Sequence, residues 1–302
     1  MKFDSSQTVG HKGGMYCYIM TPFDSQGDID HSVLERYVDA VINDGADGVT
    51  CVASTTEGVY LTESERFAAV ETVCNVASKR VPVNVGVGAL STRQVLHFAE
   101  HAQKSGAATL MLEMQTYIMR VSRAATHRHY AEVAGAVDIP IKLYNIPSTT
   151  RYDCLPDEIA GMADIEGIDS VKDATGDATR VRDVRALCGD RFSLYCGLHY
   201  VALDSYRYGA IGWEGSFHPL IGRHIVELHQ TLRAQDFDKG AKQFARLEPL
   251  FQFFKYHGVP QSIKAMSAWS DIQLGTTRRP LSELSPEQTV RLKEILTTLG
   301  CF

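Results

Sequence analysis

The sequence predicts an α/β protein: a (β/α)8 barrel, or TIM barrel, followed by a C-terminal helical extension. Short apolar runs alternate with amphipathic helical patterns eight times, at a spacing of about 25–30 residues, which is typical of a barrel of roughly 200–230 residues. Several runs are apolar on both faces, as expected of parallel strands that helices cover. The 302 residues, 44% of them hydrophobic, are enough for one large α/β domain.

The expected strands are the apolar runs at residues 15–20, 48–52, 81–87, 107–112, 140–144, 167–171, 192–196 and 210–213. Helical patterns between them cover residues 31–43, 63–78, 92–105, 122–137, 156–162, 179–187 and 200–208. Helix-start signals support several of these helices. Thr62 and Glu65 have the spacing of a capping box, and Ser91 precedes a periodic stretch that Gly106 closes.

We expect the barrel in residues 1–232 and the helical extension in residues 233–302. The C-terminal helical patterns lie near residues 221–233, 236–254, 259–269 and 285–299. Because no Pro/Gly/Ser linker separates them from the eighth unit, the extension is expected to pack on the barrel.

A doubly wound open sheet is the alternative architecture. Its support is the segment from Gly86 to Ser91, an incomplete G-x-G-x-x-S dinucleotide motif between a strand and a helix. Glu100 follows too closely to bind a ribose. The other interpretation is that these glycines allow close packing of strand and helix.

Composition argues against several classes of protein. The net charge is −6 with both signs interspersed and no long basic run, which argues against a nucleic-acid partner. The seven cysteines form no C-x-x-C pair and are expected to be reduced, as in a cytoplasmic protein. The N-terminal segment has no signal-peptide pattern, and no apolar run approaches the ~20 residues of a membrane span.

Chemically useful side chains follow three of the expected strands. Ser54 and Thr55 follow the second, Tyr144 ends the fifth, and Lys172 ends the sixth. Catalytic groups of such barrels lie at the carboxyl ends of strands. A buried lysine has a lowered pKa, and its neutral amine forms an imine with a ketone. A phenol transfers protons, and hydroxyls with backbone N–H groups hold a carboxylate. The set therefore fits Schiff-base chemistry on a 2-oxo acid.

Each of these residues also has a structural interpretation. Lys172 could be an exposed lysine at a turn, since lysines are seldom buried. Ser54 and Thr55 could cap a helix, and Tyr144 could line the barrel with its hydroxyl bonded elsewhere.

Several motifs in order carry a resemblance to a known family. They are Thr21–Pro22–Phe23, Ser54–Thr55–Thr56–Glu57, Gly86–Val87–Gly88–Ala89, Tyr144–Asn145–Ile146–Pro147, Val171–Lys172–Asp173–Ala174–Thr175–Gly176–Asp177, Gly197 and the turn from Gly209 to Gly212. The chain resembles, nearly end to end, the dihydrodipicolinate synthase / N-acetylneuraminate lyase family of pyruvate-dependent class I aldolases.

The resemblance implies a role for each matching residue. Lys172 would form the imine with pyruvate or a related 2-oxo acid, and Tyr144 would move protons. Ser54 and Thr55 would hold the substrate carboxylate, and the backbone of Glu214 would face the imine. It also implies a lyase with no metal or other cofactor, assembled as a homotetramer that is a dimer of dimers.

The sequence departs from the synthase where the second substrate would bind. Thr149 stands in place of an arginine, with Arg151 nearby, and Tyr117 is followed by Ile118 rather than by a second tyrosine. Leu198 and His199 replace acidic residues, and Thr56 replaces a glycine. An unpaired buried charge costs several kcal/mol, enough to change the substrate.

These departures favour a relative that acts on another 2-oxo acid as an aldolase, dehydratase or decarboxylase. Glu214 and His199 are then candidate acid–base groups, although His199 could also be a helix-start residue that faces water. The alternatives are an authentic 4-hydroxy-tetrahydrodipicolinate synthase and a non-catalytic 2-oxo-acid-binding relative.

Two weaker signals do not change this interpretation. His97 and His101 are four residues apart on an expected helix, but no third ligand accompanies them, so no metal site is predicted. Gly212, Gly215 and Ser216 lie where many barrels bind phosphate, but no basic residue follows before Arg223.

Overall fold

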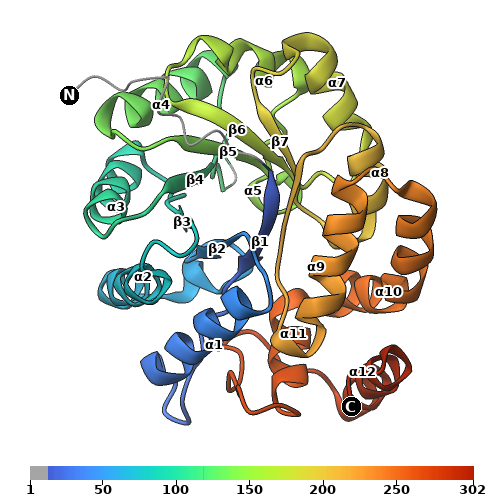
Figure 1. Ribbon diagram of the computed structural model, residues 1–302. Helices are drawn as coiled ribbons and strands as arrows, with labels where there is room; N and C mark the ends of the chain where they lie inside the picture. Colours follow the sequence, from blue (N-terminus) through green and yellow to red (C-terminus); the bar gives the residue numbers. More distant parts are fainter. Residues whose placement is uncertain (1–12, 118) are drawn as a thin grey trace. The chain divides into compact units, whose positions relative to one another are not determined.

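The computed structural model describes residues 13–117 and 119–302. Its eight strands are ordered β1 to β8 in a closed parallel barrel with alternating helices, so the predicted fold class is confirmed (Figure 1). The strands are β1 (Gly14–Tyr18), β2 (Gly48–Cys51), β3 (Val83–Gly86), β4 (Thr109–Glu113), β5 (Ile141–Asn145), β6 (Ile168–Asp173), β7 (Ser193–Cys196) and β8 (Gly212–Gly215).

The main helices agree with the periodic patterns to within a few residues. They are α1 (His31–Asn43), α2 (Glu63–Ala77), α3 (Thr92–Lys104), α4 (Arg123–Ala136), α6 (Pro156–Gly161), α7 (Thr179–Cys188), α8 (Ala202–Arg207), α9 (Pro219–Arg233), α10 (Phe237–His257), α11 (Val259–Ser267) and α12 (Pro286–Leu299). Thr62 and Glu65 make the predicted capping box at the start of α2, and Ser91 caps α3. These caps satisfy backbone N–H groups that the first turn leaves without partners.

Short helical turns were not predicted. The helix α5 (Pro147–Thr150) directly follows β5, and the 3-10 turns are η2 (Gly58–Tyr60), η3 (Met162–Asp164) and η4 (His199–Val201). The expected helix at 200–208 thus begins as a 3-10 turn and continues as α8. Segments this short carry too few residues to show a period.

By its internal contacts the chain divides into two compact units. One holds residues 84–214, with the described residues Gly13 and Gly14, and contains β4 to β7. In this unit α3, α4, α6 and α7 lie outside the strands (Figure 1). The registers pair Tyr144 with Lys172 across β5 and β6, and Lys172 with Tyr195 across β6 and β7. The three side chains therefore occupy one level of this part of the sheet.

The other unit holds residues 15–83 and 215–302. Here β1 pairs in parallel with β2, α9 packs against α1 and α10, and α12 packs against α10 and α11. The helices of the C-terminal extension thus form one packed group with α9. The proposed domain boundary at residue 232 stays a prediction.

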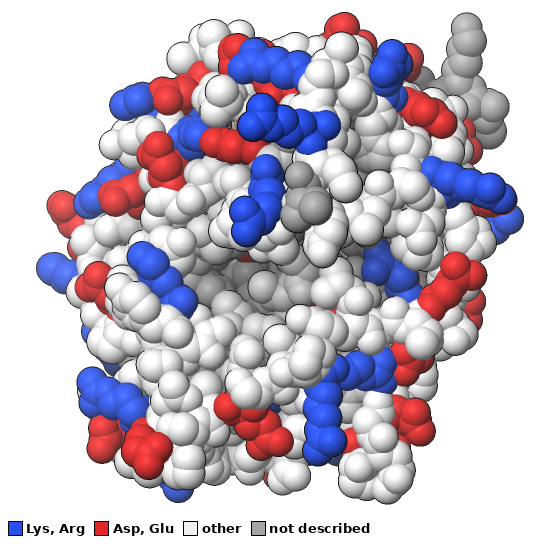
Figure 2. Space-filling model, turned by 180° about the vertical axis from the view of Figure 1, so that it is seen from behind, with Lys and Arg blue, Asp and Glu red and all other residues white. Residues whose placement is uncertain are grey.

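The surface carries both signs of charge. On the face seen in Figure 2, basic and acidic side chains are interspersed, as the composition predicts. Within residues 13–117 and 119–302, no helix is both long enough and apolar enough to cross a membrane.

Candidate active site

Lys172 is buried at the carboxyl end of β6, with only 2% of its surface exposed. Its amine nitrogen Nζ lies 4.1 Å from the centre of the Tyr144 ring. The pKa of Lys172 is lowered from 10.5 to about 7, mainly by burial; Glu214 opposes this shift, and Lys142 adds to it. The interpretation of Lys172 as an exposed turn residue is therefore wrong.

A lysine with this pKa suits nucleophilic attack. At neutral pH about half of its amines are unprotonated, whereas an ordinary lysine has less than about one in a thousand in that form. Because only the neutral amine has a free electron pair, this environment prepares Lys172 to attack a carbonyl carbon.

A buried ion pair lies in the same unit. Lys142 on β5 donates to Glu214 Oε1 on β8, and both side chains are fully buried. Asn84 Nδ2 donates to the same oxygen at 3.0 Å, and Lys142 Nζ lies 3.6 Å from the centre of the Tyr195 ring. The side chain of Glu214, a residue predicted for its backbone, thus belongs to a buried charged cluster.

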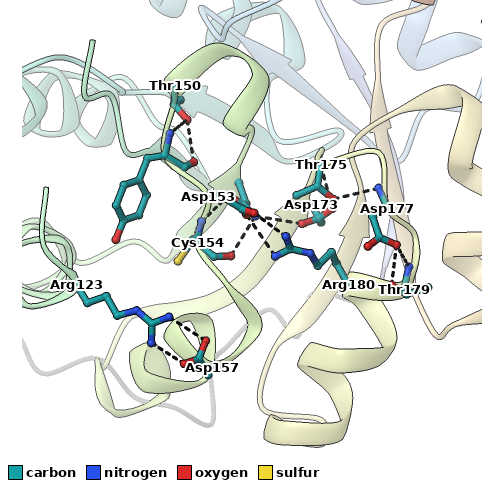
Figure 3. A network of polar contacts seen from close by, with 12 residues as sticks. Arg123, Thr150, Asp153, Cys154, Asp157, Asp173, Thr175, Asp177, Thr179 and Arg180 are labelled. Carbon is teal, nitrogen blue, oxygen red and sulfur yellow. Dashed lines mark hydrogen bonds and ion pairs between the residues drawn. The ribbon is translucent and has the colours of Figure 1, made fainter. Parts of the chain in front are cut away.

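The ends of β5 and β6 are tied together by the residues that follow Tyr144 and Lys172. Asn145 Nδ2 donates to Asp173 Oδ2 at 3.3 Å and to the carbonyl oxygen of Cys154 at 3.2 Å, and Asn145 Oδ1 accepts from Cys154 N at 3.0 Å. Asp173 Oδ1 in turn accepts from the backbone N and the hydroxyl of Thr175, at 3.1 and 2.6 Å (Figure 3).

Charged residues extend this network outward. Arg180 on α7 donates to both carboxylate oxygens of Asp153, at 3.3 and 2.6 Å (Figure 3). Asp153 Oδ1 also accepts from Asn145 Nδ2 at 3.1 Å. Burial raises the pKa of Asp173, although hydrogen bonds from Thr175 and Asn145 oppose the shift. The network therefore holds the turns on both sides of Tyr144 and Lys172.

Two glycines make room for the charged side chains. A Cβ atom on Gly197 would lie 2.9 Å from Lys172 Cε, and one on Gly88 would lie 2.3 Å from Glu113 Cδ. Gly88 thus allows close packing, as the alternative to nucleotide binding predicts, but against a carboxylate on β4 rather than against a helix.

The Ser54–Glu57 loop follows β2 in the other unit. Thr55 Oγ1 lies 3.3 Å from Ser216 Oγ, and Ser54 and Thr55 are half-buried. Thr56, at the family's glycine position, is fully buried: its hydroxyl donates to the Ala53 carbonyl at 2.9 Å, and its own carbonyl accepts from Thr21 Oγ1 at 2.8 Å. The loop therefore accommodates the threonine with its polar groups bonded.

Glu57 anchors the end of this loop. Its backbone is left-handed, with φ of 66°, and its carboxylate is fully buried. Lys264 Nζ lies 2.6 Å from Glu57 Oε1, and the backbone N of Arg278 donates to Glu57 Oε2 at 2.7 Å. Residues from the C-terminal part of the chain therefore fix the loop that carries Ser54 and Thr55.

The candidate second-substrate residues lie in different environments. Thr149 and Arg151 are exposed, in and just after α5, and Arg151 has a left-handed φ of 58°. Tyr117 is 68% exposed with φ of 53°, and its neighbour Ile118 lies outside the described residues. His199 begins the turn η4, as the structural interpretation expected, but it is buried, with its ring centre 5.3 Å from that of Trp213 in an edge-on contact. The expectation that it faces water is therefore wrong.

Sequence reasoning missed Lys142, Asn84 and Glu113. All three are buried on strands of one unit. The available signal was the position of Lys142 two residues before Tyr144, since alternate residues of a strand share a face. Among the described residues, no group of three or more His, Cys, Asp or Glu side chains could hold a metal ion, and this includes the neighbourhood of His97 and His101.

Comparison with known proteins gives a consistent result. Residues 11–299 match the profile of the Dihydrodipicolinate synthetase family. The 4-hydroxy-tetrahydrodipicolinate synthase of Shewanella baltica is 31% identical over 285 residues, which cover 94% of this chain and 97% of that protein. The Oceanobacillus iheyensis protein of the same name is 28% identical over 285 residues, covering 94% of this chain and 96% of that protein.

Solved structures agree with these sequence matches. One from Pseudomonas aeruginosa has a TM-score of 0.92 at 30% identity and covers 95% of this chain and 99% of that chain. The 4-hydroxy-tetrahydrodipicolinate synthase of Methylacidiphilum fumariolicum SolV has a TM-score of 0.91 at 27% identity, covering 95% of this chain and 96% of that chain.

Proposed function

Because the chain belongs to the dihydrodipicolinate synthetase family, we propose that it forms an imine between Lys172 and pyruvate or a related 2-oxo acid. Members of the family are metal-independent class I aldolase-type lyases that form a Schiff base with pyruvate and use no cofactor. The reaction then makes or breaks a carbon–carbon or carbon–oxygen bond next to the imine.

The observation that carries this proposal is the buried amine of Lys172 beside Tyr144. The amine has a pKa of about 7, and its nitrogen lies 4.1 Å from the Tyr144 ring centre. A nucleophile with a free electron pair and a phenol next to it are the groups that imine formation needs.

Lys172 Nζ attacks C2 of the 2-oxo acid, and the proton that Nζ loses passes to the carbonyl oxygen, which becomes a hydroxyl. Tyr144 gives a proton to this hydroxyl, which leaves as water while the C=N bond of the protonated imine forms. The imine withdraws electrons, so that a proton, which returns to the Tyr144 phenolate, or a carbon fragment leaves C3 and an enamine remains. The enamine then takes a proton or bonds to an aldehyde carbon at C3, which restores the imine. Water hydrolyses this imine and releases the 2-oxo acid and the free amine.

Carboxylate binding is assigned to Ser54 and Thr55 by the family motif. Both residues follow β2, and their hydroxyls can donate hydrogen bonds to the oxygens of a carboxylate. The backbone of Glu214 on β8 is assigned to face the imine, while its side chain pairs with Lys142. Substitution tests both assignments: changes at Ser54 or Thr55 should weaken pyruvate binding, and changes at Glu214 should affect imine formation.

The residues that would contact the second substrate differ from those of the synthase. The curated relatives named 4-hydroxy-tetrahydrodipicolinate synthase share 28–31% of their residues with this chain. Thr149 stands where that enzyme has an arginine, so we favour another 2-oxo acid or aldehyde partner over authentic synthase activity. Arg151, Tyr117 and His199 are the candidate contacts on this side.

Reductive trapping tests the imine. The protein is incubated with pyruvate and cyanoborohydride, weighed by mass spectrometry, and digested to locate the modified lysine. We expect one adduct per chain on Lys172, and none in Lys172→Met. Lys104→Met removes an exposed lysine of α3 and is the matched control, which should trap like the native protein. No adduct on the native protein would refute the proposal.

A substrate panel separates the three functional alternatives. Pyruvate is offered with aspartate semialdehyde and other aldehydes, and longer 2-oxo acids are offered alone, with pyruvate release or consumption as the readout. Turnover of aspartate semialdehyde identifies authentic synthase activity. Turnover of another compound supports the favoured function, and an adduct without turnover across the panel identifies a non-catalytic binding relative.

We further propose a homotetramer in the cytoplasm, as the family resemblance implies. Light scattering coupled to size-exclusion chromatography tests the assembly, since a tetramer of 33.4 kDa chains is easily distinguished from a dimer. Cell fractionation tests the location.

A further inference from the structure

The Lys142–Glu214 ion pair joins two strands that are not neighbours. Lys142 lies on β5 and Glu214 on β8, while the strand order places β6 and β7 between them. Their bond therefore crosses the space that the strands enclose instead of following the sheet. Both side chains have no exposed surface, so neither charge is stabilised by water.

The carboxylate of Glu214 is only partly satisfied. Its Oε1 accepts from both Lys142 Nζ and Asn84 Nδ2. Among the described residues, its buried Oε2 has no hydrogen-bond partner. A buried carboxylate with an open acceptor stabilises any nearby positive charge.

This cluster lies against the residues that flank Lys172. Lys142 is two residues before Tyr144 on β5, and Tyr144 is opposite Lys172 on β6. On the other side Lys172 is opposite Tyr195, over whose ring Lys142 Nζ lies at 3.6 Å. Two amines and one carboxylate thus share a dry interior.

Charge balance decides which amine is protonated. One ammonium and one carboxylate form a neutral pair, whereas a second ammonium would be a net buried charge, which is costly. Lys142 is the amine in direct contact with Glu214, so these two side chains form the neutral pair. The carboxylate of Glu214 raises the pKa of Lys172, whereas the charge of Lys142 lowers it.

Other titratable groups face Lys172 as well. Cys196 on β7 stays a neutral thiol because burial raises its pKa to about 11. Glu113 on β4 acts on Lys172 less strongly than Glu214 does, and it accepts a hydrogen bond from Gln115 at 2.9 Å. Asp173, the next residue of β6, is bonded to Thr175 and Asn145. Glu214 and Lys142 are therefore the two largest charged influences on the amine.

We propose that Lys142, by pairing with Glu214 across the barrel, keeps this carboxylate from holding a proton on Lys172, so that the amine is uncharged when it attacks the substrate carbonyl; Lys142 is then a positioning residue for imine formation. The inference rests on the proposed imine at Lys172. Lys142 supplies no bond to the substrate; it occupies the carboxylate that would otherwise hold a proton on Lys172.

The test is the pH dependence of reductive trapping with pyruvate, measured from pH 5.5 to 9. For the native protein, the trapping rate should rise with pH and reach half of its maximum, the midpoint, near pH 7. Lys142→Met frees Glu214 to pair with Lys172, so the midpoint should rise by one unit or more, with trapping about tenfold slower below the midpoint. Glu214→Gln should move the midpoint in the opposite direction. The double variant Lys142→Met/Glu214→Gln should return it close to the native value.

Opposite shifts separate this role from a purely structural one, which would lower the amount of folded protein without moving the midpoint. If Lys142→Met does not fold, Glu214→Gln and the double variant decide: a lower midpoint in the first and a near-native one in the second support the inference. The surface pair Lys104→Met/Glu100→Gln is the matched control and should leave the midpoint unchanged.

Two results would overturn the inference while leaving the proposed function intact. One is an adduct on Lys172 whose midpoint is the same in the native protein, Lys142→Met and Glu214→Gln. The other is an adduct that maps to Lys142. By contrast, the absence of any adduct in the native protein refutes the imine itself.

Discussion

Lys172 and Tyr144 lie opposite each other on neighbouring strands, and the lysine nitrogen is 4.1 Å from the centre of the tyrosine ring. The contact is with the face of the ring, so the ring packs against the amine while the phenol oxygen is at its edge. An amine held in this way is shielded from water on one side. The aromatic ring and the hydroxyl of Tyr144 therefore have separable effects.

Tyr144→Phe should separate the effect of the aromatic ring from that of the hydroxyl. The ring that packs on Lys172 is kept, so the midpoint of the trapping reaction should stay near pH 7. The hydroxyl to which we assign proton transfer is lost, so the exchange of pyruvate C3 protons for deuterium, followed by NMR, should slow by about 10²–10⁴-fold. An exchange rate within about twofold of the native protein would exclude Tyr144 as the proton carrier.

Lys172→Met should stabilise the protein while abolishing trapping. The folded pKa of Lys172 is about 7 and its ordinary value is 10.5. Between these values the unfolded chain binds more protons, so burial of this amine opposes folding. Its removal should raise the free energy of unfolding at pH 7 by about 3–5 kcal/mol.

The stabilisation by Lys172→Met should depend on pH. As the pH rises from 7 toward 10.5, Lys172 loses its proton in the unfolded chain too, so the advantage of the methionine variant should shrink. Urea unfolding at pH 7 and pH 9.5 measures the difference between native and variant. An advantage that stays constant or grows with pH would contradict the lowered pKa.

Much of the barrel could be predicted because parallel strands covered by helices are continuous apolar runs. The run 140–144 indicated β5, although its register with β6 shifts between Ile141 and Lys142. The helix α5 could not be predicted, since its four residues depend on Pro147 at its start and on the turn that follows β5. The strand ends were displaced by up to two residues, as for β8, because pairing with neighbouring strands sets them.

The site was predictable only where a motif or a strand end marked it. Lys172 and Tyr144 were selected in this way, and the register places them opposite each other on β5 and β6. Lys142 was missed because a lysine inside an apolar run reads as a solvent-facing residue. Its partner Glu214 is 72 residues further along the chain, and only the closure of the barrel brings the two together.

Asn145→Ala should disconnect the turns beside Tyr144 and Lys172. Asn145 is buried and donates to Asp153, Cys154 and Asp173 while accepting from Cys154 N. Loss of these bonds leaves buried polar groups without partners, so the free energy of unfolding should fall by about 2–4 kcal/mol. The deuterium exchange rate should also fall, because the two turns follow the strands that carry the proposed reacting groups Tyr144 and Lys172.

Asn43→Ala is the matched control for this substitution. Asn43 is exposed on α1 and donates to Asp39 at 3.0 Å, so its loss should change neither stability nor exchange. An Asn145→Ala protein with native stability and native exchange would mean that the network plays no part in holding the site.

Lys264→Met should weaken pyruvate binding from outside the reacting groups. Lys264 Nζ lies 2.6 Å from Glu57 Oε1, and both side chains are buried, so removing the cation leaves a buried carboxylate unpaired. Such a loss typically costs about 3–5 kcal/mol, and the Ser54–Glu57 loop should relax as a result. We expect a higher pyruvate concentration for half-maximal trapping, with a smaller change in the maximal rate.

The double variant Glu57→Gln/Lys264→Met tests whether charge is the cause. Both buried charges are then absent, while Glu57→Gln keeps an oxygen that can still accept from the backbone N of Arg278, which bonds to the native carboxylate at 2.7 Å. Stability and pyruvate affinity should therefore recover most of what Lys264→Met loses, because the penalty came from the unpaired carboxylate. If the double variant binds pyruvate as weakly as Lys264→Met, the loop is held by contacts of the lysine chain rather than by the ion pair.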